Sequence, residues 1–179
     1  MEPVRVFAAV PLPSEVRLAI AHRLASLEIP GKPIPAENWH LTLRFLGSVD
    51  LVTYERFLAG LAEVMSIGRF RVRLASFGAF PRSKNATVVW LGLDRGVAEL
   101  THLNDIAEEA AQAAGLAPED RPFRPHLTIA RVRPPVDVRW MEHEDFSSSW
   151  VADRVVVYQS HLGGGPARYE PLETFELSG

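Results

Sequence analysis

Two short stretches of this chain have nearly the same sequence: His40-Leu41-Thr42-Leu43 and His126-Leu127-Thr128-Ile129. Each alternates a polar residue with an aliphatic one, and successive side chains of a β-strand point to opposite faces of the sheet. The stretches therefore predict two half-buried strands, with histidine and threonine on one face and the aliphatic residues in the core. They lie close to half of the 179-residue chain apart. This spacing indicates two pseudo-symmetric halves whose histidines face each other across a cleft.

The repetition exceeds what chance would give. The chain has only six histidines and as few threonines, so roughly 0.2 His-x-Thr triplets are expected at random. A single triplet would be a weak signal, because a histidine on an edge strand is often simply a surface residue. Two triplets with matching hydrophobic flanks favour a functional site instead.

Length and composition are those of one globular domain. The chain is 47 % hydrophobic and 23 % charged, with a net charge of −3, which gives no general argument for nucleic-acid binding. The absence of cysteine excludes disulfides and thiolate metal sites. No apolar run is long enough to span a membrane, and the first residues lack the apolar region of a signal peptide. We therefore expect a cytoplasmic, monomeric protein with one bilobal domain over residues 1–179.

Hydrophobic periodicity and turn residues predict more strands than helices. Ser14 and Asp50 are expected N-caps, and Gly115 is expected to end the third helix. Hairpin-length links join several strands, which favours an α+β fold with two antiparallel sheets and outer helices. Residues 77–85 are expected to be a connection, and 136–149 receive no assignment. The expected helices are 14–27, 50–65 and 97–114, and the expected strands are 4–10, 39–46, 70–75, 86–93, 126–132, 154–162 and 169–177.

Two imidazoles across a cleft are suited to general acid–base catalysis. One neutral histidine can remove a proton from a nucleophile, and one protonated histidine can donate to a leaving oxygen. The hydroxyls of Thr42 and Thr128, two residues further on, can donate hydrogen bonds to an anion held between the imidazoles. A phosphodiester fits this arrangement, since it has two non-bridging oxygens and reacts by in-line displacement. No cluster of metal ligands stands beside either histidine, so neither a metal nor another cofactor is expected.

Beyond these motifs, the sequence resembles the two-histidine phosphoesterases, and within them the RNA 2′,3′-cyclic phosphodiesterase, or 2′–5′ RNA ligase, family. The resemblance covers nearly the whole chain, and the arginine- and proline-rich run that leads into the second motif is its most specific part. The residues that carry it are Arg5-Val6-Phe7-Ala8, Glu37 to Gly47, Gly78-Ala79-Phe80-Pro81, Val89-Trp90-Leu91-Gly92, Arg121 to Arg131, and Ser160-His161-Leu162 through Gly165-Pro166 to Tyr169.

This resemblance implies a bilobal fold in which antiparallel sheets line a central cleft. It implies hydrolysis of RNA 2′,3′-cyclic phosphate ends to 2′-phosphate ends, with reverse 2′–5′ ligation as a weaker activity. By family analogy, His40 is the proton donor, His126 is the proton acceptor, and Thr42 and Thr128 bind the non-bridging phosphate oxygens. RNA or an oligonucleotide is then the partner.

Four further residues are candidates for substrate contact. Arg44 shares the face of His40 if alternation is strict, so its side chain could reach the phosphate or a neighbouring nucleotide; a solvated charge is the alternative. Phe45 and Arg131 each follow a motif histidine by five positions, where the family places ligand-contacting groups. Strict alternation turns both away from the cleft, so they reach it only if the strand ends or bulges first. Arg131 is the better candidate for binding phosphate, while Phe45 and Tyr169 could equally serve packing.

Three other functions are weighed from the sequence, and one of them, a metal hydrolase with histidine ligands, predicts that a chelator abolishes activity. The protein could act on a different cyclic or 2′–5′ linked nucleotide, which a panel of substrates would reveal. It could also be a non-catalytic module that binds RNA ends, although a binder needs no proton-transfer pair.

Overall fold

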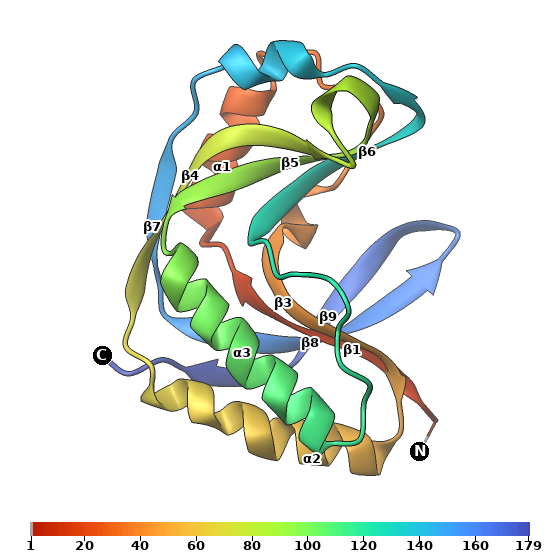
Figure 1. The fold of residues 1–179 in the computed structure, drawn as a ribbon, viewed down its shortest axis with the longest axis vertical. Coiled ribbons are helices and arrows are strands. Elements are labelled where there is room, and N and C mark those ends of the chain that lie inside the picture. Colours follow the sequence, from red (N-terminus) through yellow and green to blue (C-terminus); the bar gives the residue numbers. More distant parts are fainter. Residues whose placement is uncertain (1) are drawn as a thin grey trace.

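The computed structural model describes residues 2–179, whose strands form two antiparallel sheets (Figure 1). The four-stranded sheet has the order β3-β1-β8-β9, and the five-stranded sheet has the order β2-β6-β5-β4-β7. The strands are β1 (Val4–Pro11), β2 (Lys32–Pro33), β3 (His40–Val49), β4 (Phe70–Phe80), β5 (Ala86–Arg95), β6 (His126–Val136), β7 (Ser148–Ala152), β8 (Arg154–Gly163) and β9 (Gly165–Glu176). The predicted α+β class with two antiparallel sheets is confirmed.

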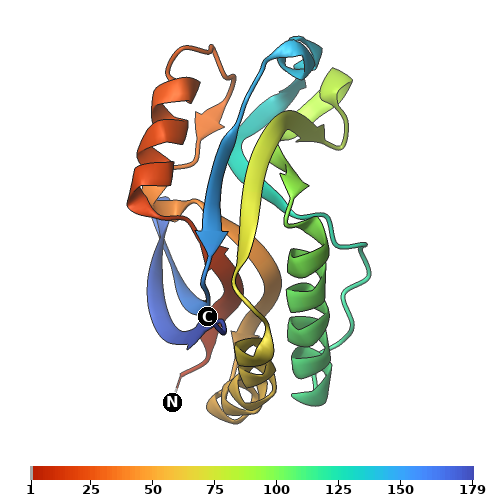
Figure 2. The same cartoon turned by 90° about the vertical axis from the view of Figure 1, so that its left-hand side faces the viewer.

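Within the described residues, three α-helices lie outside the sheets. Two of them pack side by side, and the later one also contacts β3, whereas the first lies apart from them against β7 (Figures 1 and 2). No helix within residues 2–179 is long and apolar enough to cross a membrane. The helices are α1 (Ser14–Leu24), α2 (Leu51–Leu61) and α3 (Val97–Ala113), and short 3₁₀ helices occur at η1 (Ala36–Asn38), η2 (Ala62–Ser66), η3 (Ser83–Asn85) and η4 (Arg139–His143).

Local sequence signals account for the start of one helix and for the end of another. The Asp50 side chain accepts a hydrogen bond from the Thr53 amide at 2.8 Å, which makes it the predicted N-cap of α2. Gly115 ends α3 with φ of +100°, and the amide of Leu116 reaches back to the Ala111 carbonyl at 3.0 Å. The prediction for Ser14 is wrong, because Ser14 is already helical and the Pro13 carbonyl accepts the first bonds of α1.

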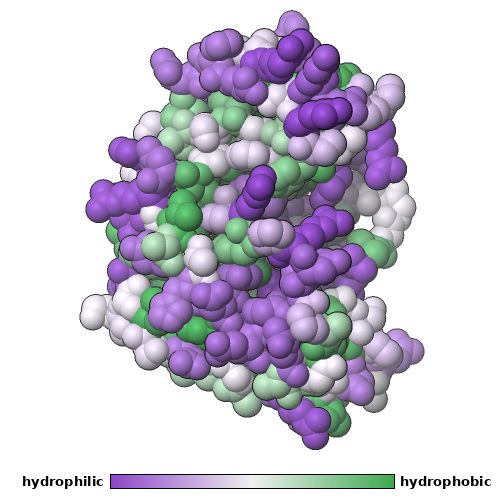
Figure 3. All heavy atoms as spheres, in the orientation of Figure 1, coloured by the Kyte–Doolittle hydropathy of each residue, from purple (hydrophilic) through white to green (hydrophobic). Residues whose placement is uncertain are grey.

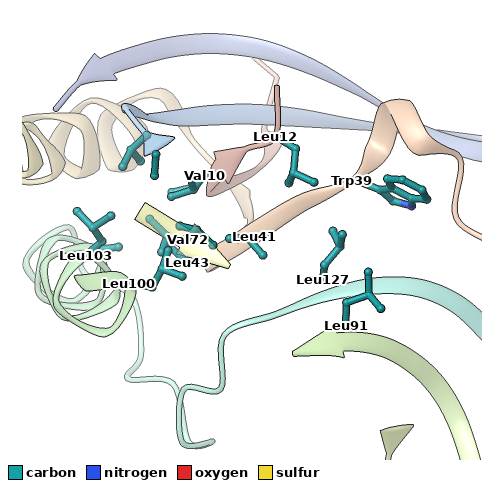
Figure 4. Close-up of a cluster of buried hydrophobic side chains, with 14 of the residues drawn as sticks. Val10, Leu12, Trp39, Leu41, Leu43, Val72, Leu91, Leu100, Leu103 and Leu127 are labelled. Atoms are coloured by element: carbon teal, nitrogen blue, oxygen red, sulfur yellow. The ribbon is translucent and has the colours of Figure 1, made fainter. Parts of the chain in front are cut away.

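One hydrophobic core joins the two sheets. The aliphatic residues between each histidine and threonine, Leu41 and Leu127, are 1 % and 0 % exposed. Both lie in the same buried cluster as Leu91 of β5 and Leu100 of α3 (Figure 4). Hydrophilic side chains cover much of the face that Figure 3 shows. The apolar half of each motif therefore holds its strand against the common core and leaves the polar half on the other face.

The largest differences between the structure and the sequence-based expectation lie in two regions. Strand β4 continues to Phe80, through residues that were expected to be a connection, because Gly78 pairs with Trp90 on β5. The glycine leaves room for the indole, so the turn-like composition does not break the strand. The unassigned residues 136–149 contain η4 and the start of β7, which adds an edge strand beside β4.

We predict that Gly78→Ala lowers the free energy of unfolding by about 1–3 kcal/mol, because an added methyl group overpacks this contact. A Cβ at this position would lie 2.2, 2.3 and 2.6 Å from three atoms of the Trp90 ring. Gly164→Ala is the matched control, since its Cβ would have no atom within 4 Å. Urea unfolding measures both variants, and equal stabilities would contradict the predicted contact.

Candidate active site

The two histidine strands come from different sheets and line one cavity. Strand β3 contributes His40 and Thr42 from the edge of the four-stranded sheet, and β6 contributes His126 and Thr128 from the five-stranded sheet. All four residues line a cavity of about 630 Å³. The pseudo-symmetric arrangement expected from the repeated motif is therefore present in the structure.

Each histidine ring is oriented by the main chain two residues before it. Nδ1 of His40 lies 2.7 Å from the Asn38 carbonyl oxygen, and Nδ1 of His126 lies 2.6 Å from the Arg124 carbonyl oxygen. A carbonyl oxygen can only accept, so Nδ1 carries the hydrogen in both rings. In the neutral rings, Nε2 is consequently the unprotonated nitrogen that can accept a proton.

Aromatic rings enclose the imidazole of His40. Its ring centroid lies 4.8 Å from that of Phe7 and 5.2 Å from that of Tyr169, whose ring stands edge-on at 78°. Tyr169, which lies on β9, thus contacts His40, a predicted catalytic residue. The Asn38 side chain also donates a hydrogen bond of 2.6 Å to the Ala167 carbonyl, so β9 is tied to the residue whose own carbonyl orients His40.

His126 also has aromatic neighbours, which come from the other sheet, but it is less enclosed than His40. The Phe80 ring meets it edge-on at 88° with a centroid distance of 5.1 Å, and the Trp90 ring lies 6.1 Å away. Trp90 is the residue whose ring packs against Gly78. Aromatic contacts therefore restrict both rings, and His40 has less access to water than His126.

Burial lowers the pKa of both imidazoles, because it disfavours the charged form. The pKa of His40 falls to about 4; its bond to the Asn38 carbonyl opposes the shift and the nearby His126 adds to it. Burial is also the main cause that lowers the pKa of His126, and the bond to the Arg124 carbonyl again opposes it, while the positive charge of Arg131 adds to it. Both histidines of the unliganded protein are therefore neutral at pH 7.

Both strands bulge at the same place after the histidine. Ala9 pairs with Thr42 and Ala8 with Arg44, which leaves Leu43 without a partner on β1. On β6, Thr128 and Ala130 pair with consecutive residues of β5, so Ile129 is the extra residue. An extra residue reverses the alternation that follows it. The bulges therefore turn the fifth residue after each histidine toward the cavity.

Phe45 and Arg131 are these fifth residues, and both line the cavity. The Phe45 ring is half exposed and lies 5.2 Å from Phe7, the ring that contacts His40. Arg131 is exposed and close enough for its charge to affect His126. The structure thus supplies the bulge that these two candidates require.

Arg44 does not lie where strict alternation predicts. The bulge puts it on the side of α3, where it is only 8 % exposed. Its guanidinium donates to the Glu108 carboxylate and to the carbonyls of Phe45 and Ala117. Arg44 borders the cavity, but each of its three guanidinium nitrogens donates a hydrogen bond within the protein, so it is not a solvated charge.

Sequence reasoning missed several residues that shape the site. Phe7, Phe80 and Trp90 surround the histidines; the family resemblance includes these residues but gives them no role in the site. Asn38 is nearly buried and has a local signal, since it stands two residues before His40, as Arg124 does before His126. This position supplies the orienting carbonyl in both halves.

Known proteins are similar to this chain in sequence and in fold over nearly its full length. Residues 13–164 match the model of the "2'-5' RNA ligase superfamily". An RNA 2′,3′-cyclic phosphodiesterase from Escherichia coli is 34 % identical over 99 % of this chain and 98 % of its own.

Solved structures agree with this match. The crystal structure of E. coli LigT complexed with 3′-AMP has a TM-score of 0.81 at 32 % identity and covers 99 % of this chain and all of its own. That of TT0787 from Thermus thermophilus has a TM-score of 0.80 at 29 % identity, with 98 % of each chain covered. The matched sequence, the common fold and the paired histidine strands lead to one conclusion: this chain belongs to the 2′–5′ RNA ligase superfamily.

Proposed function

We propose that this protein hydrolyses the 2′,3′-cyclic phosphate at RNA ends to a 2′-phosphate and a 3′-hydroxyl. The observation that carries the proposal is the pair of imidazoles in one cavity, each with Nδ1 committed to a carbonyl and Nε2 available for proton transfer. The E. coli relative, an RNA 2′,3′-cyclic phosphodiesterase, supports this choice of substrate.

The proposed reaction is an in-line displacement at phosphorus. His126 accepts a proton from water as the water oxygen bonds to phosphorus, and the bond from phosphorus to O3′ breaks. His40 donates a proton to the departing O3′. After each turnover, His126 releases a proton and His40 takes one up, by exchange with solvent. A 5′-hydroxyl in place of water would give a 2′–5′ linkage by the same steps, which is the proposed ligase activity.

The remaining cavity residues have proposed binding roles. The hydroxyls of Thr42 and Thr128 donate to the non-bridging oxygens, and the guanidinium of Arg131 compensates the phosphate charge. Phe45 and Tyr169 are proposed to contact the terminal nucleotide. The site thereby has its own proton donors, acceptors and positive charge, and both histidines come from one copy of the chain. We therefore propose a monomeric enzyme that requires no cofactor.

The first test is an assay with a short RNA that ends in a 2′,3′-cyclic phosphate, carried out in EDTA. We expect a 2′-phosphate product, because the proposed leaving oxygen is O3′ and the histidines perform both proton transfers. Chromatography against 2′- and 3′-phosphate standards identifies the product. Turnover of another cyclic or 2′–5′ linked nucleotide alone, or tight RNA-end binding without turnover, would replace the proposal with one of the alternative functions.

We predict that His40→Ala and His126→Ala each lower kcat by about 10²–10⁴-fold, the usual contribution of one general acid or base. His22→Ala is the matched control, because His22 is an exposed histidine of α1 outside the cavity. Circular dichroism checks that all three variants are folded. Near-normal turnover in either cavity variant would rule out the two-histidine mechanism.

The rate should depend on pH as a bell-shaped curve. The base must be neutral, so kcat/KM falls at pH below its pKa, and the acid must be protonated, so kcat/KM falls at pH above its pKa. Burial sets the pKa of His40 to about 4 and lowers that of His126, so the maximum of kcat/KM should lie below the ordinary histidine value of 6.5. Bound phosphodiester stabilises the charged rings, so the kcat curve should lie at higher pH. Steady-state kinetics over a pH series measure both curves, and a monotonic kcat/KM would contradict them.

A further inference from the structure

The buried guanidinium of Arg44 connects three parts of the chain. From β3, its Nε donates to Oε2 of Glu108 on α3 at 2.5 Å, and one terminal nitrogen donates to the Ala117 carbonyl at 2.7 Å. The other terminal nitrogen donates to the carbonyl of the neighbouring Phe45. A surface ion pair contributes little to stability, but this guanidinium side chain is only 9 % exposed and all of its nitrogens are occupied. Such a group holds the atoms around it in fixed positions.

Glu108 completes the connection. Its second carboxylate oxygen, Oε1, accepts from the Glu119 amide at 2.9 Å and from the Gln112 side chain at 3.0 Å. Burial opposes ionisation of this carboxyl, yet the bonds from Glu119, Gln112 and Arg44 outweigh it and lower its pKa. The carboxylate is therefore charged at neutral pH. We call Arg44 and Glu108, with the Ala117 carbonyl and Glu119 amide that they bind, the clasp.

The clasp is attached to the segment that leads into the second histidine strand. Residues 117–125 run from the end of α3 to β6, and within residues 2–179 no backbone–backbone hydrogen bond to this segment is found. Besides the clasp, the partly buried Phe123 packs this segment against the core. Arg124 is the second-last residue of this segment, and its carbonyl accepts the hydrogen bond from Nδ1 of His126. The position of that carbonyl consequently depends on few contacts.

We propose that Arg44 and Glu108 are positioning residues for the proposed base, acting through residues 117–125 to hold the Arg124 carbonyl against Nδ1 of His126. The kinetic part of this inference rests on the proposed function, whereas its effect on the imidazole does not. The two histidines should respond differently, because His40 is oriented by Asn38, which lies outside the segment.

The test replaces Arg44 by alanine and follows both imidazoles by NMR titration in the full-length protein. The bond to the Arg124 carbonyl opposes the lowering of the pKa of His126. When the clasp is removed, the pKa of His126 should therefore fall further, while that of His40 stays unchanged. Arg44→Lys, which retains the charge and some of the donors, should restore part of the shift. Equal shifts of both histidines, or none, would overturn the proposal.

Kinetics supply a second readout. A misplaced base impairs the transition state more than substrate binding, so kcat should fall by up to about 100-fold with KM little changed. Glu108→Gln, which keeps the side-chain shape, should give a smaller loss and serves if Arg44→Ala does not fold. Arg73→Ala is the matched control, because it breaks an exposed arginine–carboxylate pair with Asp94 away from the cavity. A lowered melting temperature with normal kcat and His126 pKa would assign the clasp a purely structural role.

If the parent protein does not turn over cyclic phosphate ends, the proposed function fails, but the NMR comparison still decides the positioning inference. If the parent is active and the His126 pKa is insensitive to Arg44→Ala, the positioning inference alone fails. The two failures are therefore distinguishable.

Discussion

The hydrogen bond from each imidazole to the carbonyl two residues before it is the constraint on which the site depends. His40 binds the Asn38 carbonyl and His126 binds the Arg124 carbonyl, so both rings present the same nitrogen to the cavity. Because the partner is backbone, the tautomer is set by where each strand begins rather than by another side chain. The surrounding strands, aromatic rings and connecting segments all act to keep those two strand starts in place.

The paired bulges extend this local control along each strand. If the same sequence formed no bulges at Leu43 and Ile129, each strand would keep its strict alternation after the threonine, and Phe45 and Arg131 would face the core. One inserted position in each strand changes two side chains at once: the fifth residue reaches the cavity, and Arg44 is directed toward α3 instead. The bulges thus account both for the cavity residues Phe45 and Arg131 and for the contact of Arg44 with α3.

Much of the fold could be predicted because the signals involved are local. The alternation around His40 and His126, the Asp50 cap and the Gly115 stop each depend on a few neighbouring residues. Other features could not be predicted, since they depend on partners distant in the sequence. The bulges are defined only against β1 and β5, β4 continues past Gly78 because of Trp90, and the bonds of Arg44 reach α3 and the segment after it.

The unequal enclosure of the two histidines gives the cavity a direction. Tyr169 and Phe7 cover His40, and its bond to Asn38 is partly buried, whereas the bond of His126 to Arg124 is exposed to solvent. A nucleophile drawn from bulk water needs an open route, but a leaving oxygen arrives already attached to the substrate and needs none. In the proposed mechanism, the more open side is that of the base, where water enters, and the more enclosed side is that of the leaving ribose oxygen, although the two motifs are nearly identical in sequence.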